Sequence, residues 1–536
     1  MGHWQLFLDD WALERATGFD RVVHHPRAHG VVIPADRPWE TGGASPGFVG
    51  RREDGSFFAL YTAMWWDLDR GERIENEGFR GDRAHHLFSG LAWATSPDGL
   101  HWEKPELGLL EAPAGVDRAR HAPFPSPKGF DRRNNLGVPF AVVADLGQHG
   151  NVTDPERRYA LRLAHSGGDV GGSHQRQTRG YFSPRIPDFL GDPAWREQLA
   201  DSGGAFNPRR HTLHFWDEIH REWVAMDQGV VPHWLPSREI GRFASPDLIH
   251  WTSSAALYPD PADPHLPHCY DEPMSLTPFC AEGVVFGLLS WFHSDRTHPE
   301  GGPVLEPTPE HPHRWPWCRT GTNEMRITLS RDGGRTWDRS SSRVAWIPHA
   351  TEEHSYDRLV IGACPPVRVG DEDWFYTLVI DGDHLVIRNN PQQSAYYADR
   401  LVRHQIALYT QKRNRYVSLR AGHRPEVLIT RPFVVNGKEL QLNLDASRGW
   451  VRAALAPAGP VDTALCPSTA AHVLWSESGG FDQLLPGFGF DDGEPVRGDH
   501  PEVAVRFRGD LKALRGLQVR LLFEVADTDL YGFRFA

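Results

Sequence analysis

The sequence predicts an all-β chain, built as a five-bladed β-propeller followed by a C-terminal β-sandwich. Three observations lead to this fold class. A polar turn ending in tryptophan recurs along the first 420 residues, apolar runs precede its copies, and strict alternation of apolar and polar residues begins after about residue 423. Repeats at a spacing of roughly 80 residues are typical of propeller blades. We therefore predict two domains, a catalytic propeller over 1–423 and a sandwich over 424–536.

The recurring turn has three clear copies, at Ala94–Trp102, Ala244–Trp251 and Leu329–Trp337. The third copy contains Ser-x-Asp-x-Gly-x-Thr-Trp, the Asp box of propeller blades. Weaker copies at Tyr181–Arg185 and Ala407–Val417 bring the number to five. Serine and aspartate side chains can cap the N–H groups of such a turn, and the tryptophan can pack between neighbouring sheets. We expect these residues to be structural rather than catalytic.

Five apolar, β-rich runs are expected to form the inner strands of the blades. A single sandwich with as many strands would not repeat a turn at blade spacing. The runs cover residues 57–61, 159–163, 211–215, 284–289 and 374–379.

The C-terminal part is predicted as a sandwich because its short segments alternate between apolar and polar residues. These segments cover 438–445, 503–508, 519–525 and 531–535. Three long insertions interrupt the propeller half, and insertions of that length usually carry function or move. They cover roughly 67–90, 106–133 and 295–318.

The composition excludes several classes of protein. With 57 Lys and Arg against 70 Asp and Glu, the net charge is −13, which disfavours nucleic acid and anionic membranes as partners. No secretory signal and no membrane-spanning apolar run is visible, so we expect a soluble, cytoplasmic protein. The 5 cysteines lack CxxC spacing, which argues against a disulfide scaffold or zinc ribbon.

Several short motifs resemble glycoside hydrolase family 32, whose five-bladed propeller carries a C-terminal sandwich. The fructosidases of that family carry Trp-Met-Asn-Asp-Pro-Asn, Arg-Asp-Pro and Glu-Cys motifs, and this chain has none of them. The resemblance is thus to a branch without those motifs, and it implies the architecture and a glycoside substrate. The motifs are residues 6–10, Arg37–Glu40, Trp102–Pro105, Asn134 with Asn135, 418–422 and 430–433.

Glycoside hydrolysis uses two carboxyl groups that flank the scissile bond, one of them protonated. In a propeller the starts of the inner strands converge on one funnel, so acids at these starts are the catalytic candidates. Crowding of like charges there would raise one pKa and keep that carboxyl protonated. The alternative for Glu40 is an ion pair with an arginine, and the alternative for Asp201 is a turn. The candidates are Glu40, Asp201, Asp271, Glu272 and Asp357.

Six further residues are predicted to bind the substrate. The tryptophans among them would stack on a sugar face, although tryptophan more often packs between blades. They are Asp10, Trp39, Trp66, Asn135, Arg319 and His384.

The 29 histidines raise the question of a metal. The segment His349-Ala350-Thr351-Glu352-Glu353-His354 contains ligand types, but it is not the helical His-Glu-x-x-His of zinc proteases, and Pro348 favours a loop. We therefore predict no metal and no cofactor.

The leading functional hypothesis is a glycosidase, or a transglycosidase of the same mechanism, acting on a small furanoside or related glycoside. The partner is a small carbohydrate, and a homo-oligomer is compatible with the sequence. Two alternatives stay open: a non-catalytic carbohydrate-binding propeller, and a propeller enzyme of sialidase or polysaccharide-lyase type, the lyase using Tyr or His with a metal.

Overall fold

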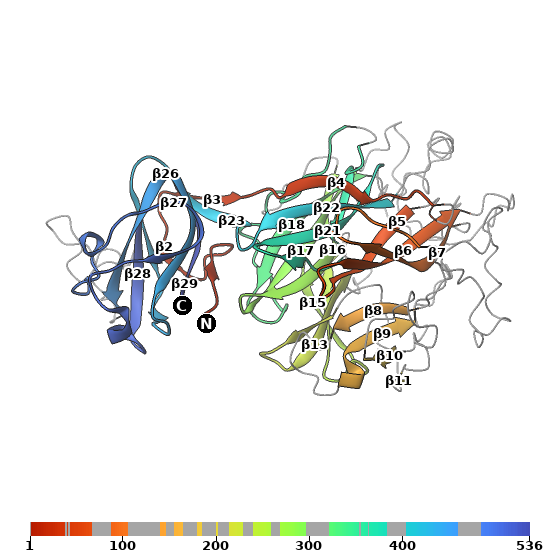
Figure 1. The fold of residues 1–536 in the computed structure, drawn as a ribbon, viewed down its shortest axis with the longest axis horizontal. Coiled ribbons are helices and arrows are strands. Elements are labelled where there is room, and N and C mark those ends of the chain that lie inside the picture. Colours follow the sequence, from red (N-terminus) through yellow and green to blue (C-terminus); the bar gives the residue numbers. More distant parts are fainter. Residues whose placement is uncertain are drawn as a thin grey trace, which may run out of the picture.

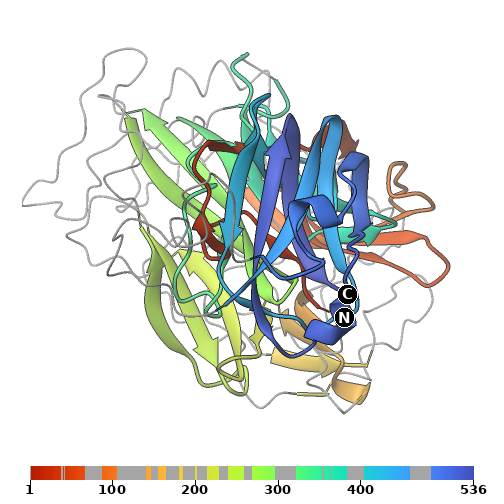
Figure 2. The ribbon, with the colours of Figure 1, turned by 90° about the vertical axis from the view of Figure 1, so that its left-hand side faces the viewer.

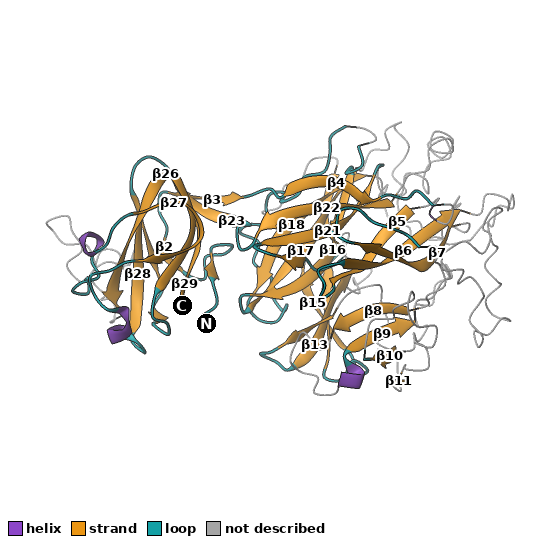
Figure 3. Cartoon of the chain, viewed as in Figure 1, coloured by secondary structure: helices purple, strands orange, loops and turns teal. Residues whose placement is uncertain are grey.

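The computed structural model describes residues 2–37, 40, 43–66, 87–105, 140–145, 155–163, 180–184, 200–201, 214–228, 239–258, 269–295, 321–352, 355–362, 364–382, 404–458 and 484–536. These residues form strands, turns and three short 3-10 helices, with no α-helix among them (Figure 3). The all-β prediction is confirmed for this part of the chain. No helix within it could cross a membrane.

A ten-stranded sheet occupies one end of the molecule (Figure 1). It contains the strands predicted from the alternating segments near the C-terminus, and its core includes Leu442, Val451, Leu521, Phe523 and Phe533. Strands from the first 23 residues also pair into it, although the sequence grouped them with the propeller half. Its members are β1 (Gln5–Leu6), β2 (Leu13–Arg15), β3 (Phe19–Val23), β23 (Val417–Ala421), β24 (Glu426–Thr430), β25 (Phe433–Val434), β26 (Leu440–Pro457), β27 (Val496–Val505), β28 (Gln518–Ala526) and β29 (Thr528–Phe535).

An eleven-stranded sheet forms much of the other end. It consists of three antiparallel groups, which single parallel bridges join at Asn323–Leu359 and His404–Gly43. The first group is β5 (Gly43–Arg51), β6 (Phe57–Trp66) and β7 (Leu87–Ser96). The second is β16 (Cys269–Ala281), β17 (Val284–Asp295) and β18 (Gly321–Ser330). The third is β19 (Leu359–Gly362), β21 (Glu372–Ile380) and β22 (His404–Lys412), with β20 (Val367–Val369) beside β21 and β4 (Arg27–Ile33) beside β22.

Two four-stranded antiparallel sheets complete the fold (Figure 1). In Figure 2 the ten-stranded sheet lies in front, and these two sheets lie behind it with the eleven-stranded sheet. One sheet is β8 (Phe140–Asp145), β9 (Tyr159–Leu163), β10 (Gly180–Ser183) and β11 (Ala200–Asp201). The other is β12 (His214–Asp217), β13 (Glu222–Gln228), β14 (Ile240–Ser245) and β15 (Thr252–Leu257).

Most of the apolar runs that were expected to be inner strands of blades lie in the middle of a set of antiparallel strands. Four of them lie in β6, β9, β17 and β21, each of which pairs with strands on both of its sides. Such a strand is covered on its faces and along both edges, so it carries the most continuous apolar sequence. The run at 211–215 falls at β12, with 211–213 outside the described residues.

The three clear copies of the turn share one hydrogen-bond pattern. In the first copy, Ser96 Oγ accepts from the N–H of Gly99 at 2.8 Å, and Asp98 Oδ1 accepts from the N–H groups of Leu100 and His101, both at 2.8 Å. The N–H and the imidazole of His101 hold the pKa of Asp98 well below its usual range. Trp102 packs edge-on against Tyr376 of the neighbouring group. The predicted capping and packing roles are confirmed here.

The Asp332 carboxylate is expected to contribute about 1–2 kcal/mol to stability, the range of a good capping residue. It accepts from the N–H groups of Arg335 and Thr336 at 3.1 and 2.9 Å and from Thr336 Oγ1 at 2.6 Å. Denaturant unfolding of Asp332→Ala should show this loss. The matched variant Asp332→Asn keeps one acceptor oxygen and should lose less. Equal stability of the alanine variant and the parent protein would contradict the assigned role.

Candidate functional site

The candidate site lies at one edge of the eleven-stranded sheet. The parallel bridges Asn323–Leu359 and His404–Gly43 align the beginnings of β18, β19, β22 and β5 at this edge. Cys269, at the beginning of β16, pairs there with the end of β17. Adjacent strands within each group are antiparallel, so the second strand of each group ends at this edge and the third strand begins there. Functional side chains carried by several strands can meet there.

Three neighbouring strands place Asp271, His293 and Glu324 on one face of the sheet. Asp271 of β16 lies directly opposite His293 of β17, and Glu324 of β18 is diagonal to His293 because it pairs with Trp291. Asp271 Oδ1 is 2.7 Å from His293 Nδ1, and His293 Nε2 is 3.3 Å from Glu324 Oε2. One imidazole thus connects two buried carboxylates.

Arg326 holds the other side of Glu324. Its Nε donates to Glu324 Oε1 at 2.7 Å, and both residues lie on the same face of β18. The guanidinium groups of Arg326 and Arg339 lie 4.6 and 4.5 Å from the ring centre of Trp291, which is fully buried. This packing fixes the position of Arg326 and directs Glu324 Oε2 away from it.

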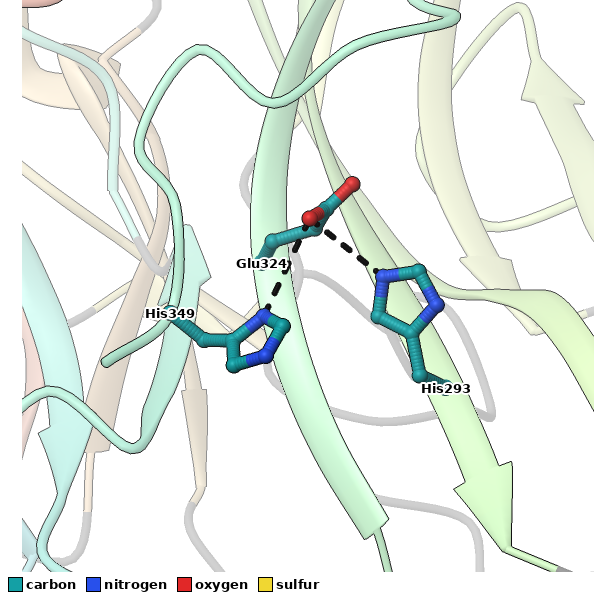
Figure 4. Close-up of side chains that lie close together, drawn as sticks. All are labelled: His293, Glu324 and His349. Carbon is teal, nitrogen blue, oxygen red and sulfur yellow. Dashed lines mark ion pairs between the residues drawn. The ribbon is translucent and has the colours of Figure 1, made fainter. Parts of the chain in front are cut away.

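His349 reaches the same carboxylate from the segment that follows β18. Trp346 and Ile347 donate their N–H groups to the carbonyl of Met325, at 2.8 and 2.9 Å, which fixes this segment against β18. His349 Nδ1 then lies 3.8 Å from Glu324 Oε2. Figure 4 shows the two imidazoles on either side of the Glu324 carboxylate, joined to it by the two ion-pair contacts. We call His293, Glu324 and His349 the His–Glu–His cluster.

The charges of the cluster are set by these contacts. Burial by itself lowers the pKa of His293, but the carboxylates of Asp271 and Glu324 outweigh this effect and raise the pKa to about 9. Burial by itself raises the pKa of Glu324, yet His293 and Arg326 hold that pKa at about 2. In the absence of a ligand, a protonated His293 therefore lies beside the ionised carboxylate of Glu324 at neutral pH.

The structure brings together some of the predicted catalytic residues. Asp271 belongs to the site, whereas the next residue, Glu272, points to the opposite face because side chains alternate along a strand. Asp357 lies close to the cluster: its carbonyl accepts from the N–H of Ala350 at 3.0 Å, and its carboxylate accepts from Ser355 Oγ at 2.5 Å. Asp201 ends β11 in a separate four-stranded sheet, and its side chain lies outside the described residues.

Glu40 has a full set of partners. Its Oε1 accepts from Tyr61 at 2.6 Å, and its Oε2 accepts from Lys104 Nζ at 2.6 Å and from the N–H groups of Asp36 and Arg37, both at 3.1 Å. The sequence left open an ion pair of Glu40 with an arginine as the alternative to catalysis; the structure shows an ion pair, but with Lys104. The contacts assign Glu40 a structural task, and its catalytic role stays a prediction.

Of the predicted substrate-binding residues, only Asp10 has a described side chain. It is exposed, pairs with Arg21 at 2.5 Å, and lies between β1 and β2 beside the ten-stranded sheet. Trp66 ends β6 at the edge that carries the site, but its side chain is not described. Trp39, Asn135, Arg319 and His384 lie outside the described residues.

Sequence reasoning missed His293, Glu324 and Arg326, and it gave His349 the wrong neighbours. It grouped His349 with Glu352 and with His354, which is not described, whereas the structure brings it to β17 and β18. A signal was present in the sequence. His293 precedes the predicted insertion 295–318 and Glu324 follows it, so both are polar residues at strand ends that border a long insertion.

A second group of ligand-type residues, Asp217, His220 and Glu222, lies in the β12–β13 turn. Here Arg242 contacts Asp217 Oδ2 at 3.1 Å and Glu222 Oε1 at 2.7 Å, and its Nε donates to the carbonyl of Gly333 at 2.8 Å. A guanidinium therefore already neutralises these carboxylates. This group ties the β12–β15 sheet to the turn after β18.

No family model and no curated protein matches the chain. Solved structures with a similar arrangement include a protein described as a glycoside hydrolase, at 11% identity and a TM-score of 0.39, covering 73% of this chain and 92% of that one. A β-1,2-mannobiose phosphorylase from Listeria innocua matches at 12% identity and a TM-score of 0.35, over 77% and 97%. A family 117 glycoside hydrolase from the marine bacterium Zobellia galactanivorans matches at 12% and 0.31, over 74% and 91%.

These structural neighbours process glycosides, as their names state, but scores this low do not transfer an activity to this chain. The likeness to glycoside hydrolase family 32 stays a prediction.

Proposed function

We propose that this chain is a glycosidase that acts on a small furanoside or related glycoside at the edge carrying the His–Glu–His cluster. The observation that carries the proposal is the buried carboxylate of Glu324, which two imidazoles and one guanidinium surround. The carboxylate of Asp271 contacts His293, and the backbone of Asp357 is hydrogen-bonded to Ala350, the residue after His349. Such a concentration of acids and bases at a strand edge is typical of catalytic sites.

The chemistry follows from the two protonation states that glycoside cleavage requires. Glu324, with its pKa held at about 2, is ionised at any working pH and suits attack on the sugar or activation of water. We assign the second carboxyl group to Asp357, which lies next to the segment that carries His349. Asp271 shares His293 with Glu324, so its task is to orient that imidazole rather than to flank the substrate.

We also propose that the five antiparallel strand groups are the blades of a five-bladed propeller. Each group contains at least three consecutive antiparallel strands, and the recurring turn lies between groups, where Trp102 meets Tyr376. The ten-stranded sheet would then be the sandwich, with the chain entering it near residue 423. In a propeller the edge with the cluster would face the central funnel, which is where a small carbohydrate would bind.

A lyase that acts on a uronic-acid polysaccharide is the second candidate. It is favoured by one observation, the approach of two imidazoles to one carboxylate, since such lyases need a base and a cation that neutralises the uronate. The two reactions have different products. A lyase leaves a carbon–carbon double bond that absorbs in the ultraviolet, whereas a glycosidase leaves a new reducing end without that absorption.

The proposed function is tested with a panel of aryl glycosides and uronic-acid polysaccharides. We expect turnover of a glycoside, and we expect Glu324→Gln and Asp357→Asn to lower kcat at least ~100-fold, a usual loss for a residue engaged in the reaction. His220→Gln, in the turn neutralised by Arg242, should retain turnover. Undiminished turnover in both carboxylate variants would overturn the site assignment, and an unsaturated product would favour the lyase.

A further inference from the structure

We propose that His293 Nε2, Glu324 Oε2 and His349 Nδ1 bind one divalent transition-metal ion, with zinc as the first choice. The inference rests on the proposed function and deepens it: with the ion bound, Glu324 would serve as a ligand and would contribute to activating water through the ion rather than by attacking the sugar itself. The binding itself can be measured without any substrate.

The geometry of the three atoms fits a metal of this kind. One ligand atom of each residue lies within 4.8 Å of the other two, and Glu324 Oε2 is 3.3 Å from His293 Nε2 and 3.8 Å from His349 Nδ1. Zinc bonds to histidine and carboxylate of about 2.0–2.2 Å place neighbouring corners of a tetrahedron ~3.4 Å apart. The two distances to Glu324 Oε2 match this separation to within a few tenths of an ångström, and the two imidazole nitrogens, no more than 4.8 Å apart, would close by at most ~1.4 Å.

The donor set also matches the chemistry of such ions. Two imidazoles and one carboxylate suit zinc, manganese or iron, and three protein ligands leave the fourth position of a tetrahedral zinc open for water. His293 Nε2 is buried, and its contact with Glu324 at 3.3 Å does not have the geometry of a hydrogen bond. In Figure 4 this nitrogen faces the carboxylate across a short gap.

The partners of two of the three ligand residues, His293 and Glu324, provide the strongest argument. Histidines that bind metals usually donate their second N–H to a carboxylate, and ligating carboxylates are themselves hydrogen-bonded. Here His293 Nδ1 contacts Asp271 Oδ1 at 2.7 Å, and Glu324 Oε1 accepts from Arg326 at 2.7 Å. Both outer partners engage the atom that faces away from the convergence point and leave the inner atom for an ion.

The two groups of ligand-type residues differ in how a guanidinium meets their carboxylates. In the His–Glu–His cluster, Arg326 contacts Oε1 of Glu324, and Oε2 faces the two imidazoles. In the Asp217–His220–Glu222 group, Arg242 bridges both carboxylates and takes the place of a cation. The two groups therefore form a matched pair within one chain, in which the second serves as the control for the first.

The test uses the full-length, tag-free protein after treatment with a chelator. Isothermal titration with Zn²⁺ and with Mn²⁺, together with elemental analysis after gel filtration, should give one tightly bound ion per chain. We expect His293→Gln, His349→Gln and Glu324→Gln each to weaken binding at least ~100-fold. Asp271→Asn should weaken it ~10–100-fold, as outer partners of metal ligands do. His220→Gln should bind like the parent protein.

Near-ultraviolet circular dichroism establishes that each variant is folded, and Co²⁺ gives a second readout through the visible absorption of a tetrahedral site. Absence of a stoichiometric ion in the parent protein would overturn the inference, as would full binding in all three ligand variants. A substrate panel without turnover would count against the glycosidase alone. A protein that binds no ion yet cleaves a glycoside would count against the metal alone.

Discussion

Lys104→Met is expected to lower the free energy of unfolding by about 3–5 kcal/mol at pH 7, the usual cost of breaking a buried ion pair by removing one partner. The side chains of Lys104 and Glu40 are 3% and 0% exposed, and Nζ lies 2.6 Å from Glu40 Oε2. The same ammonium contacts Asp36 Oδ1 at 3.0 Å and the carbonyl of Pro34. Without it, a buried carboxylate loses its only described cation.

The pH dependence of this variant follows from Glu40. Burial raises the pKa of Glu40 and Lys104 opposes that rise, so removing Lys104 should raise the pKa further. A raised carboxyl pKa costs stability only above the unfolded value near 4.5, where the unfolded chain ionises more readily. The deficit of Lys104→Met should therefore shrink as the pH falls toward 4.5, as denaturant unfolding at several pH values would show.

The control is the double variant Glu40→Gln with Lys104→Met. Replacing both members of a buried ion pair by neutral groups often costs little, so the double variant should recover much of the loss. If Lys104→Met unfolds at the same denaturant concentration as the parent protein, the ion pair contributes nothing to stability.

The ion pair between Lys104 and Glu40 also gives a physical reason for two of the sequence motifs. Arg37–Glu40 and Trp102–Pro105 were both part of the resemblance to a glycosidase family. In the structure, their Glu40 and Lys104 form the buried pair, and Tyr61 completes it. The motifs therefore report a structural contact between the segment that joins β4 to β5 and the turn that follows β7. They say less about catalysis than their appearance in the sequence suggested.

The strands and turns could be predicted because their signals are local. A Ser-x-Asp turn contains all its own donors and acceptors, as Ser96 and Asp98 illustrate, so its hydrogen bonds can be read from nine consecutive residues. Alternation in β26 and β28 likewise follows from the two faces of one strand. Such features need no knowledge of which strands are neighbours.

The candidate site could not be predicted because its contacts depend on register between distant segments. Asp271 meets His293 only because the β16–β17 hairpin pairs these two positions, and a shift by one residue would turn one side chain to the other face. Glu324 and His349 join across a further insertion and a loop. Asp271 could be selected from the sequence because it lies near the start of a strand. Its partner His293, which defines its role, could not be identified in the same way.

His293 should make the stability of the metal-free protein depend on pH on the alkaline side. The pKa of His293 is about 9 in the folded protein against 6.5 in the unfolded chain. A group whose pKa is raised by folding stabilises fully below the unfolded value, and this contribution disappears as the pH rises through the folded value. We expect a loss on the order of 3 kcal/mol between pH 6.5 and 9, at 1.36 kcal/mol per pKa unit.

The measurement is the urea midpoint at half-unit steps of pH, with chelator present, for the parent protein and His293→Gln. The groups that face His293 are Asp271, Glu324, His349 and, through Glu324, Arg326. The variant lacks the titrating imidazole, so its midpoint should change less over this range. Asp271→Asn removes one of the two carboxylates, which should lower the pKa of His293 and move the loss to a lower pH. A parent midpoint that stays constant from pH 6.5 to 9, or an equal decline in His293→Gln, would show that His293 is not held as a cation between the two carboxylates.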